Sequence, residues 1–216
     1  MRVLRNWEDY DDFSDGVLDA AKWETAYFSG GQTPVEANGK IELKGGTYTG
    51  SDPSKFPSGL EGMAQRSQGE GNSALFLKDE KTYGLEADLT LPTTGNSQEA
   101  GIFLDVVSAD LLETAGLELA WRDGRVVFSF DYIDPVSGQE VDVEIPAQLD
   151  TTYRVAVIHS GSRILLYLND EKIADFAGTF TPAFWLIGSF NDDGNPFTSY
   201  VDNVRVLRNW EDYDDF

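Results

Sequence analysis

The segment LELAWRDGRVVFSF, residues 117–130, predicts a β-hairpin in which every residue can be assigned to a strand or to the turn. Apolar and polar side chains alternate on both sides of Asp123-Gly124, as in half-buried strands. Asp-Gly suits a two-residue turn, since glycine accepts the positive φ that such a turn needs. The expected cross-strand pairs are Arg122 with Arg125, Trp121 with Val126, Leu119 with Phe128, and Leu117 with Phe130.

This register divides the hairpin into an apolar and a polar face. Side chains of strands alternate between the two faces of a sheet, so the apolar set should face the core. The next segment, EVDVEI at 140–145, divides in the same way. The expected core residues are Leu117, Leu119, Trp121, Val126, Phe128, Phe130, Tyr132, Val141, Val143 and Ile145. The other face carries Glu118, Arg122, Arg125, Ser129, Asp131, Glu140, Asp142 and Glu144, so one sheet should have a carboxylate-rich outer face.

The same alternation recurs along nearly the whole chain. About a dozen short apolar-polar segments are separated by Gly, Asp, Asn and Pro at the spacing typical of a β-sandwich. Only DAAKWETA and ADLLETAG have helical composition, and each is too short to build a helical layer. We therefore expect an all-β sandwich with one module at 10–208.

Composition restricts the function. The 38 acidic and 16 basic residues give a net charge of −22, which repels nucleic acids and anionic membrane surfaces. No apolar run reaches the roughly 20 residues of a membrane helix, so we expect no membrane insertion. The acidic excess suits divalent cations or a saline medium, and solubility alone explains it equally well. The chain has no cysteine, which rules out a disulfide frame or a thiol nucleophile.

Three segments resemble one fold family. They are DDFSDGVLDAAKWE (11–24), TTYRVAVIHSGSRILLYLNDEKIADF (151–176) and FWLIGSFNDDGNPFTSYVDNVRVL (184–207). Together they resemble the opening, the central strand pair and the end of concanavalin A-like jelly-roll domains, the fold of laminin-G-type, lectin-like and glucanase domains. The resemblance implies a two-sheet antiparallel jelly roll. This architecture serves binding, catalysis and spacing alike.

The resemblance implies a structural calcium site. In such domains an aspartate of the last strand holds the ion, which matches Asp202. Backbone carbonyls near the first strand and near the glycine turn after KIEL complete the site, which corresponds to the regions of Asp12 and Gly45. Calcium accepts this irregular set of oxygen ligands. The acidic turn with Asp192 and Asp193 is a further candidate.

One motif matches a catalytic pattern. Lichenases and laminarinases of this fold carry E-x-D-x-E on a strand, with the outer glutamates as nucleophile and acid/base, and Glu140, Asp142 and Glu144 fit that pattern. Residues i, i+2 and i+4 share one strand face, as the chemistry requires. The motif stands closer to Tyr153 than in those enzymes, and no tryptophan accompanies it. An amphipathic strand with a solvated acidic face explains it equally well.

Sugar binding would need exposed aromatic side chains beside hydrogen-bonding groups. Tyr48, Trp185 and Phe197 are the candidates. Tyr48 lies in a long Gly, Ser and Pro-rich segment that is suited to form a binding rim.

The chain also repeats itself. RVLRNWEDYDDF occurs at 2–13 and again at 205–216, an offset of 205 − 2 = 203 residues. We expect neighbouring identical repeats in a longer array, with 1–9 as the end of the preceding linker and 209–216 as the start of the next repeat. Trp7 and its copy Trp210, with Asn209 and Tyr213, should form the junction between repeats.

Three functions follow as hypotheses. The first is a spacer module of a secreted or surface-attached bacterial adhesin, stiffened by calcium. The second is a lectin-like, carbohydrate-binding module. The third is a glycosidase of the lichenase or laminarinase type that uses Glu140 and Glu144.

Overall fold

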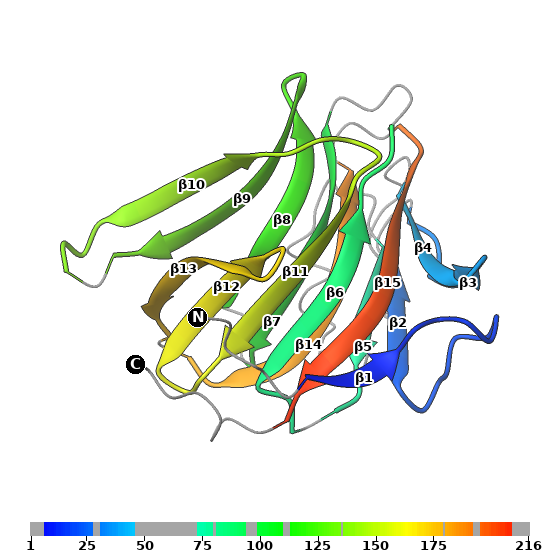
Figure 1. The fold of residues 1–216 in the computed structure, drawn as a ribbon, viewed down its shortest axis with the longest axis horizontal. Helices are drawn as coiled ribbons and strands as arrows, with labels where there is room; N and C mark the ends of the chain where they lie inside the picture. The colour runs from blue at the N-terminus through cyan, green and yellow to red at the C-terminus, as the bar shows by residue number, and fades with distance from the viewer. Residues whose placement is uncertain are drawn as a thin grey trace.

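Two antiparallel β-sheets form the described part of the protein, with no helix in it. The computed structural model describes residues 7–27, 31–45, 73–79, 81–93, 99–109, 113–134, 136–178, 180–191 and 195–208. Figure 1 shows the two sheets as layers, with β6, β11 and β15 in front of β7, β14 and β5. No helix long and apolar enough to cross a membrane occurs among the described residues.

The first sheet has eight strands in the order β13-β12-β11-β6-β15-β4-β3, and β1 also pairs with β15. Its strands are β1 (Trp7–Asp11), β3 (Val35–Ala37), β4 (Lys40–Gly45), β6 (Gly84–Thr90), β11 (Thr152–His159), β12 (Arg163–Leu168), β13 (Glu171–Ala177) and β15 (Phe197–Leu207).

The second sheet has seven strands in the order β10-β9-β8-β7-β14-β5-β2. Its strands are β2 (Trp23–Tyr27), β5 (Ser73–Leu77), β7 (Glu99–Ser108), β8 (Thr114–Arg122), β9 (Arg125–Ile133), β10 (Glu140–Pro146) and β14 (Pro182–Asn191). These two sheets confirm the all-β sandwich.

The central hairpin has the register that its sequence predicts. Arg122 lies opposite Arg125, Trp121 opposite Val126 and Leu119 opposite Phe128. The turn residues Asp123 and Gly124 have φ values of 49° and 75°, as a two-residue turn with positive φ requires.

The core between the sheets contains the side chains that alternation places inward. Leu117, Leu119, Phe128 and Phe130 are buried there, and Trp121, Val126, Tyr132, Val143 and Ile145 pack against them half-buried. Glu140 and Glu144 on the same strand as Val143 are exposed. The predicted division of this sheet into an inner and an outer face is therefore confirmed.

The first strand begins earlier than the sequence suggests. We expected residues 1–9 to be linker and the module to begin at residue 10, but β1 pairs with β15 from Trp7 onward. Trp7 packs on the outer face of the first sheet against Leu207 and its neighbours. This apolar contact holds residues 7–9 in the sheet.

Candidate functional site: a carboxylate-lined cavity on the seven-stranded sheet

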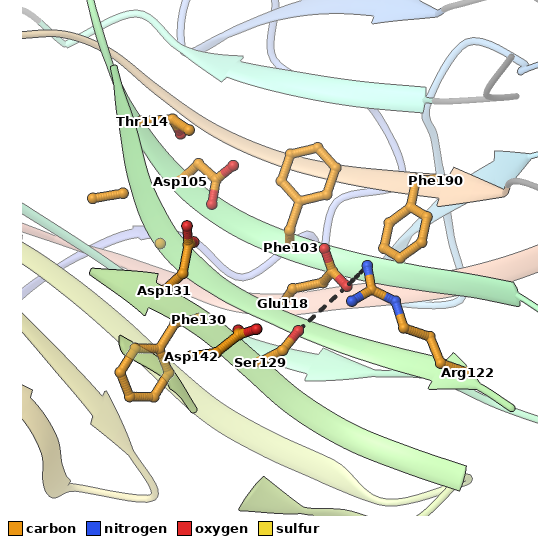
Figure 2. A pocket seen from close by; sticks show the side chains of 12 residues that line it. Phe103, Asp105, Thr114, Glu118, Arg122, Ser129, Phe130, Asp131, Asp142 and Phe190 are labelled. Atoms are coloured by element: carbon orange, nitrogen blue, oxygen red, sulfur yellow. Dashed lines mark hydrogen bonds and ion pairs between the residues drawn. The ribbon is translucent and has the colours of Figure 1, made fainter. Parts of the chain in front are cut away.

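An open cavity of about 390 Å³ lies on the outer face of the seven-stranded sheet, over β7, β8, β9 and β10. Carboxylates line it from all four strands: Asp105, Glu118, Asp131 and Asp142. Figure 2 shows these side chains projecting into the same opening, with Phe103, Phe190 and Arg122 along one side. The cavity therefore combines several carboxylates with two aromatic rings and one cation.

Strand register brings the two central carboxylates together. Asp105 of β7 lies opposite Gly116 of β8, and Phe103 lies opposite Glu118. Asp105 and Glu118 are therefore diagonal neighbours, which lie about 7–8 Å apart between their backbones. Asp142 on β10 pairs with Asp131 on β9.

Gly116 makes the room that Asp105 needs. A Cβ added at Gly116 would overlap the Oδ1 atom of Asp105 and the carbonyl of Leu104. A side chain at position 116 would therefore displace the carboxyl group from the cavity wall.

Asp105 holds its proton far more tightly than an ordinary aspartate. Burial, and then the negative charge of Glu118, raise the pKa of Asp105 from 3.8 to about 7. The charge of Asp131 acts in the same direction, and a hydrogen bond with the Thr114 side chain acts against them. A large fraction of Asp105 is therefore protonated at neutral pH.

Glu118 has the opposite surroundings. Its Oε1 atom lies 2.7 Å from Nη2 of Arg122, and the Ser129 hydroxyl lies 3.5 Å away. Arg122 also contacts Glu99, at 3.3 Å, and lies over the ring of Phe190. Glu118 is therefore paired with a cation, whereas Asp105 is buried beside a negative charge.

Two phenylalanine rings lie across glycines of the neighbouring strand. Phe103 lies opposite Gly188, and Phe190 lies opposite Gly101. A Cβ at either glycine would overlap the ring opposite it. Phe103 is half-buried, so part of its ring faces the cavity.

The raised pKa of Asp105 predicts a pH-dependent stability. Because the folded protein holds this proton above the unfolded value of 3.8, the stabilisation is complete below about pH 3.8 and is lost as the pH rises through about 7. Wild type loses this stabilisation as Asp105 ionises, whereas Asp105→Asn cannot ionise. The free energy of unfolding of Asp105→Asn minus that of wild type should therefore increase by about 2 kcal/mol between pH 5 and pH 8.5, which corresponds to roughly 4–8 °C in Tm. Thermal unfolding of both proteins at several pH values measures this.

Asp142→Asn is the matched control, because it removes an exposed carboxylate from the rim of the same cavity. Its stability relative to wild type should change much less over this pH range. A Tm difference for Asp105→Asn that stays constant with pH would show that Asp105 is ionised at neutral pH like an ordinary aspartate.

The E-x-D-x-E motif lies on the edge strand of the sheet. Asp142 lines the cavity, whereas Glu140 and Glu144 do not. Glu144 pairs with Arg125 at 3.2 Å across the hairpin. The structure thus brings one residue of the motif, Asp142, to the carboxylates of β7, β8 and β9.

Two of the three aromatic residues expected to bind sugar are buried. Trp185 and Phe197 are only 4% and 6% exposed and belong to the main core. The alternation of β14 and β15 turns them inward, so the assignment of these two residues was wrong. Tyr48 lies outside the described residues.

The residues expected to hold calcium are brought together in part. Burial raises the pKa of Asp202. The Asn203 N–H bond and the charge of Lys40 lower this pKa, whereas the nearby charges of Asp88 and Asp12 raise it further. Gly45 does not lie there, because it pairs with Phe197, whereas Ile41 at the other end of β4 pairs with Val201. No group of three or more metal-ligating side chains occurs among the described residues, and Asp192 and Asp193 are not among them. A calcium ion at Asp202 and Asp12 stays a prediction.

Of the junction residues, the structure describes Trp7 alone. It stands over Gly84, whose added Cβ would lie 3.2 Å from the Trp7 ring. Asn209, Trp210 and Tyr213 lie outside the described residues, so the junction between repeats also stays a prediction.

Sequence reasoning missed the central residues of the cavity. It placed Glu118, Arg122, Ser129 and Asp131 on the outer face without assigning them a role. Asp105 was not considered, because EAGIFLDVV reads as a mostly buried strand with one polar interruption. That isolated carboxylate in an apolar strand was the available signal.

The two packed antiparallel sheets form a sandwich of the concanavalin A-like jelly-roll type. Among solved structures, the chain is similar to the laminarinase catalytic domain from Thermotoga maritima, with a TM-score of 0.61 and 13% identity over 94% of this chain and 98% of that one. It is also similar to a lichenase from a mouse hindgut metagenome, with a TM-score of 0.60 and 13% identity over 92% and 98% of the two chains. A third is an endo-β-galactosidase from Clostridium perfringens, with a TM-score of 0.65 and 13% identity over 98% of this chain and 65% of that one.

These likenesses establish the fold and not the activity. No protein-family model and no curated protein matches the sequence. The chemistry of the cavity must therefore be argued from its own residues.

Proposed function

We propose that the protein is a glycoside hydrolase that cleaves a neutral β-linked polysaccharide in the cavity over β7 to β10. The observation that carries this proposal is a pair of diagonal carboxyl groups in different surroundings: burial and the charge of Glu118 raise the pKa of Asp105 to about 7, and Glu118 forms an ion pair with Arg122. Such a pair is what acid/base cleavage of a glycosidic bond requires.

The two residues have distinct roles in this proposal. Asp105 gives its proton to the leaving glycosidic oxygen as the C1–O bond breaks. The carboxylate of Glu118 acts at C1, either directly or by taking a proton from water, and water supplies the hydroxyl group of the new reducing end. Carboxyl groups about 5.5 Å apart serve the direct route and groups about 6.5–9.5 Å apart serve the route through water.

The surroundings favour an uncharged substrate. The chain has a net charge of −22, and four acidic side chains line the cavity, so a uronic acid or sulfated glycan would be repelled. The half-buried ring of Phe103 offers an apolar surface on which a sugar ring can stack. Proteins of similar structure are described as acting on 1,3-β-glucan and on β-1,3-1,4-glucan, which are neutral.

The test is hydrolysis of laminarin and lichenan, with a charged polysaccharide such as alginate as the third substrate. We expect new reducing ends from a neutral glucan and none from alginate. Asp105→Asn should lower the rate and remove the limb of the pH profile near pH 7, because the residue that holds the proton is gone. Binding of a neutral glucan without release of sugar would refute catalysis and favour the lectin-like function instead.

The spacer function rests on a different observation. The duplicated stretch supports it, whereas the cavity contributes nothing to it, and the structures named above carry the names of glycosidases. A repetitive adhesin, its calcium and its place on the cell surface therefore remain proposals that rest on the sequence alone.

A further inference from the structure

Arg122 has no role in the cleavage described above, yet it contacts one of the two carboxyl groups that perform it. Its Nη2 atom lies 2.7 Å from Oε1 of Glu118, and the Ser129 hydroxyl donates to the same oxygen at 3.5 Å. A guanidinium group is planar and carries its N–H donors in fixed directions. An ion pair with a fixed guanidinium therefore restricts the orientation of the Glu118 carboxylate.

Arg122 reaches Glu118 by lying back along its own strand. Residues i and i+4 of a strand are about 13 Å apart, and their side chains project from the same face of the sheet. The outer-face position between them is Ala120, which pairs with Gly101 of β7. These two small residues leave room above the sheet for the long Arg122 side chain.

Two further contacts hold the guanidinium group in place. Glu99, the residue opposite Arg122 on β7, has Oε1 3.3 Å from the Nε atom of Arg122. The Cζ atom of Arg122 lies 5.6 Å from the centroid of the Phe190 ring, which fills the space above Gly101. Figure 2 shows the guanidinium group between the Phe190 ring and Glu118. Because the face of an aromatic ring attracts a cation, Phe190 and Glu99 together fix the group that contacts Glu118.

These contacts contribute little to the stability of the fold. The side chains of Arg122 and Glu99 are 36% and 42% exposed. Ion pairs with this exposure add little to the free energy of unfolding, because water and salt screen them. An arrangement that adds little stability but fixes a carboxylate in the cavity is better explained by the chemistry of the site than by the fold.

We propose that Arg122 is a positioning residue for the glycoside hydrolysis described above. It holds the Glu118 carboxylate in the orientation that acts at C1, and Glu99 and Phe190 hold Arg122 in turn. This inference rests on the proposed function, because the orientation of Glu118 matters to a rate only if Glu118 reacts.

Steady-state kinetics of the full chain on its preferred neutral glucan test this role. Arg122→Ala should lower kcat by about 10–10²-fold, the loss expected when a reacting group is misplaced by about 1 Å. KM should stay within about twofold, since in this role Arg122 acts on Glu118 and not on the substrate. Arg122→Lys should recover only part of kcat, because an ammonium group lacks the planar fork that contacts Glu118 and Glu99 together. Tm of either variant should fall by no more than about 4 °C.

Arg125→Ala is the matched control for the loss of an arginine from this hairpin. Arg125 lies opposite Arg122 and forms its own ion pair with Glu144, but it does not line the cavity. Its removal should leave kcat within about twofold of wild type.

Crystal structures of wild type and Arg122→Ala give a readout that needs no activity. We expect the Glu118 carboxylate of the variant to leave its wild-type position or to occupy several positions. Glu118 in its wild-type position, an unchanged kcat of Arg122→Ala, or full activity of Arg122→Lys would each overturn the positioning role. If wild type releases no sugar from any glucan, the proposed function fails instead, and the two structures still decide whether Arg122 holds Glu118.

Discussion

Glu118→Gln is expected to lower kcat on a neutral β-glucan by about 10²–10⁴-fold. The amide is nearly isosteric with the carboxylate but has no negative charge, so it can neither attack C1 nor accept a proton from water. It also loses the ion pair with Arg122, now 2.7 Å long. Steady-state kinetics on the preferred glucan measure the loss, and the Tm of the variant shows whether it folds.

Glu140→Gln and Glu144→Gln are the matched controls for this experiment. Both residues belong to the E-x-D-x-E motif, yet both are exposed on edge strand β10 and neither lines the cavity. Each variant should keep kcat within about twofold, since surface substitutions away from the site change little. A large loss on Glu140→Gln with normal activity of Glu118→Gln would move the catalytic centre to the edge strand and refute the site proposed above.

Trp23→Ala is expected to produce the largest loss of stability from a single substitution. Trp23 is 2% exposed, and its ring contacts Tyr10 edge-on at 5.4 Å and Phe13 at 6.0 Å between centroids. Removing so large a buried ring costs about 3–5 kcal/mol, which corresponds to roughly 6–20 °C in Tm for a chain of this length. Unlike Phe13, Trp23 has no second copy in the chain.

Trp23→Phe separates packing from hydrogen bonding. It keeps an aromatic ring but removes the indole N–H that donates to Asp11, so it should cost less, about 1–3 kcal/mol. Chemical denaturation of wild type and both variants gives the comparison. Equal losses for the two variants would mean that the hydrogen bond, rather than the buried ring, holds the first strand to β2.

The sheets were predictable because period-two alternation is local information. Asp123-Gly124 fixed one turn, and the turn fixed the register and the inner face of the hairpin. The start of β1 was not predictable in this way. WEDYD has a mostly charged sequence, and it is a strand because Trp7 and Phe13 find apolar surfaces that only the folded chain provides.

The cavity could be anticipated only in part. Alternation put Glu118 and Asp131 on the outer face, but nothing in the sequence sets Asp105 diagonally beside Glu118, because that depends on the pairing of β7 with β8. The segment 140–144 matches the E-x-D-x-E pattern in sequence, but it lies on the edge strand of the sheet. Trp185 and Phe197 were misassigned because the residue type alone does not distinguish a buried aromatic side chain from an exposed one.

The Phe103–Gly188 and Phe190–Gly101 pairs limit how this protein can diverge. In each pair the ring occupies the space where the partner's side chain would begin. The four positions therefore act in evolution as two linked units, and a glycine can gain a side chain only after the ring opposite it has become smaller. In an alignment of relatives, the two positions of each pair should therefore covary. A lineage that replaces either glycine before the ring opposite it should pass through an ancestral protein that folds poorly.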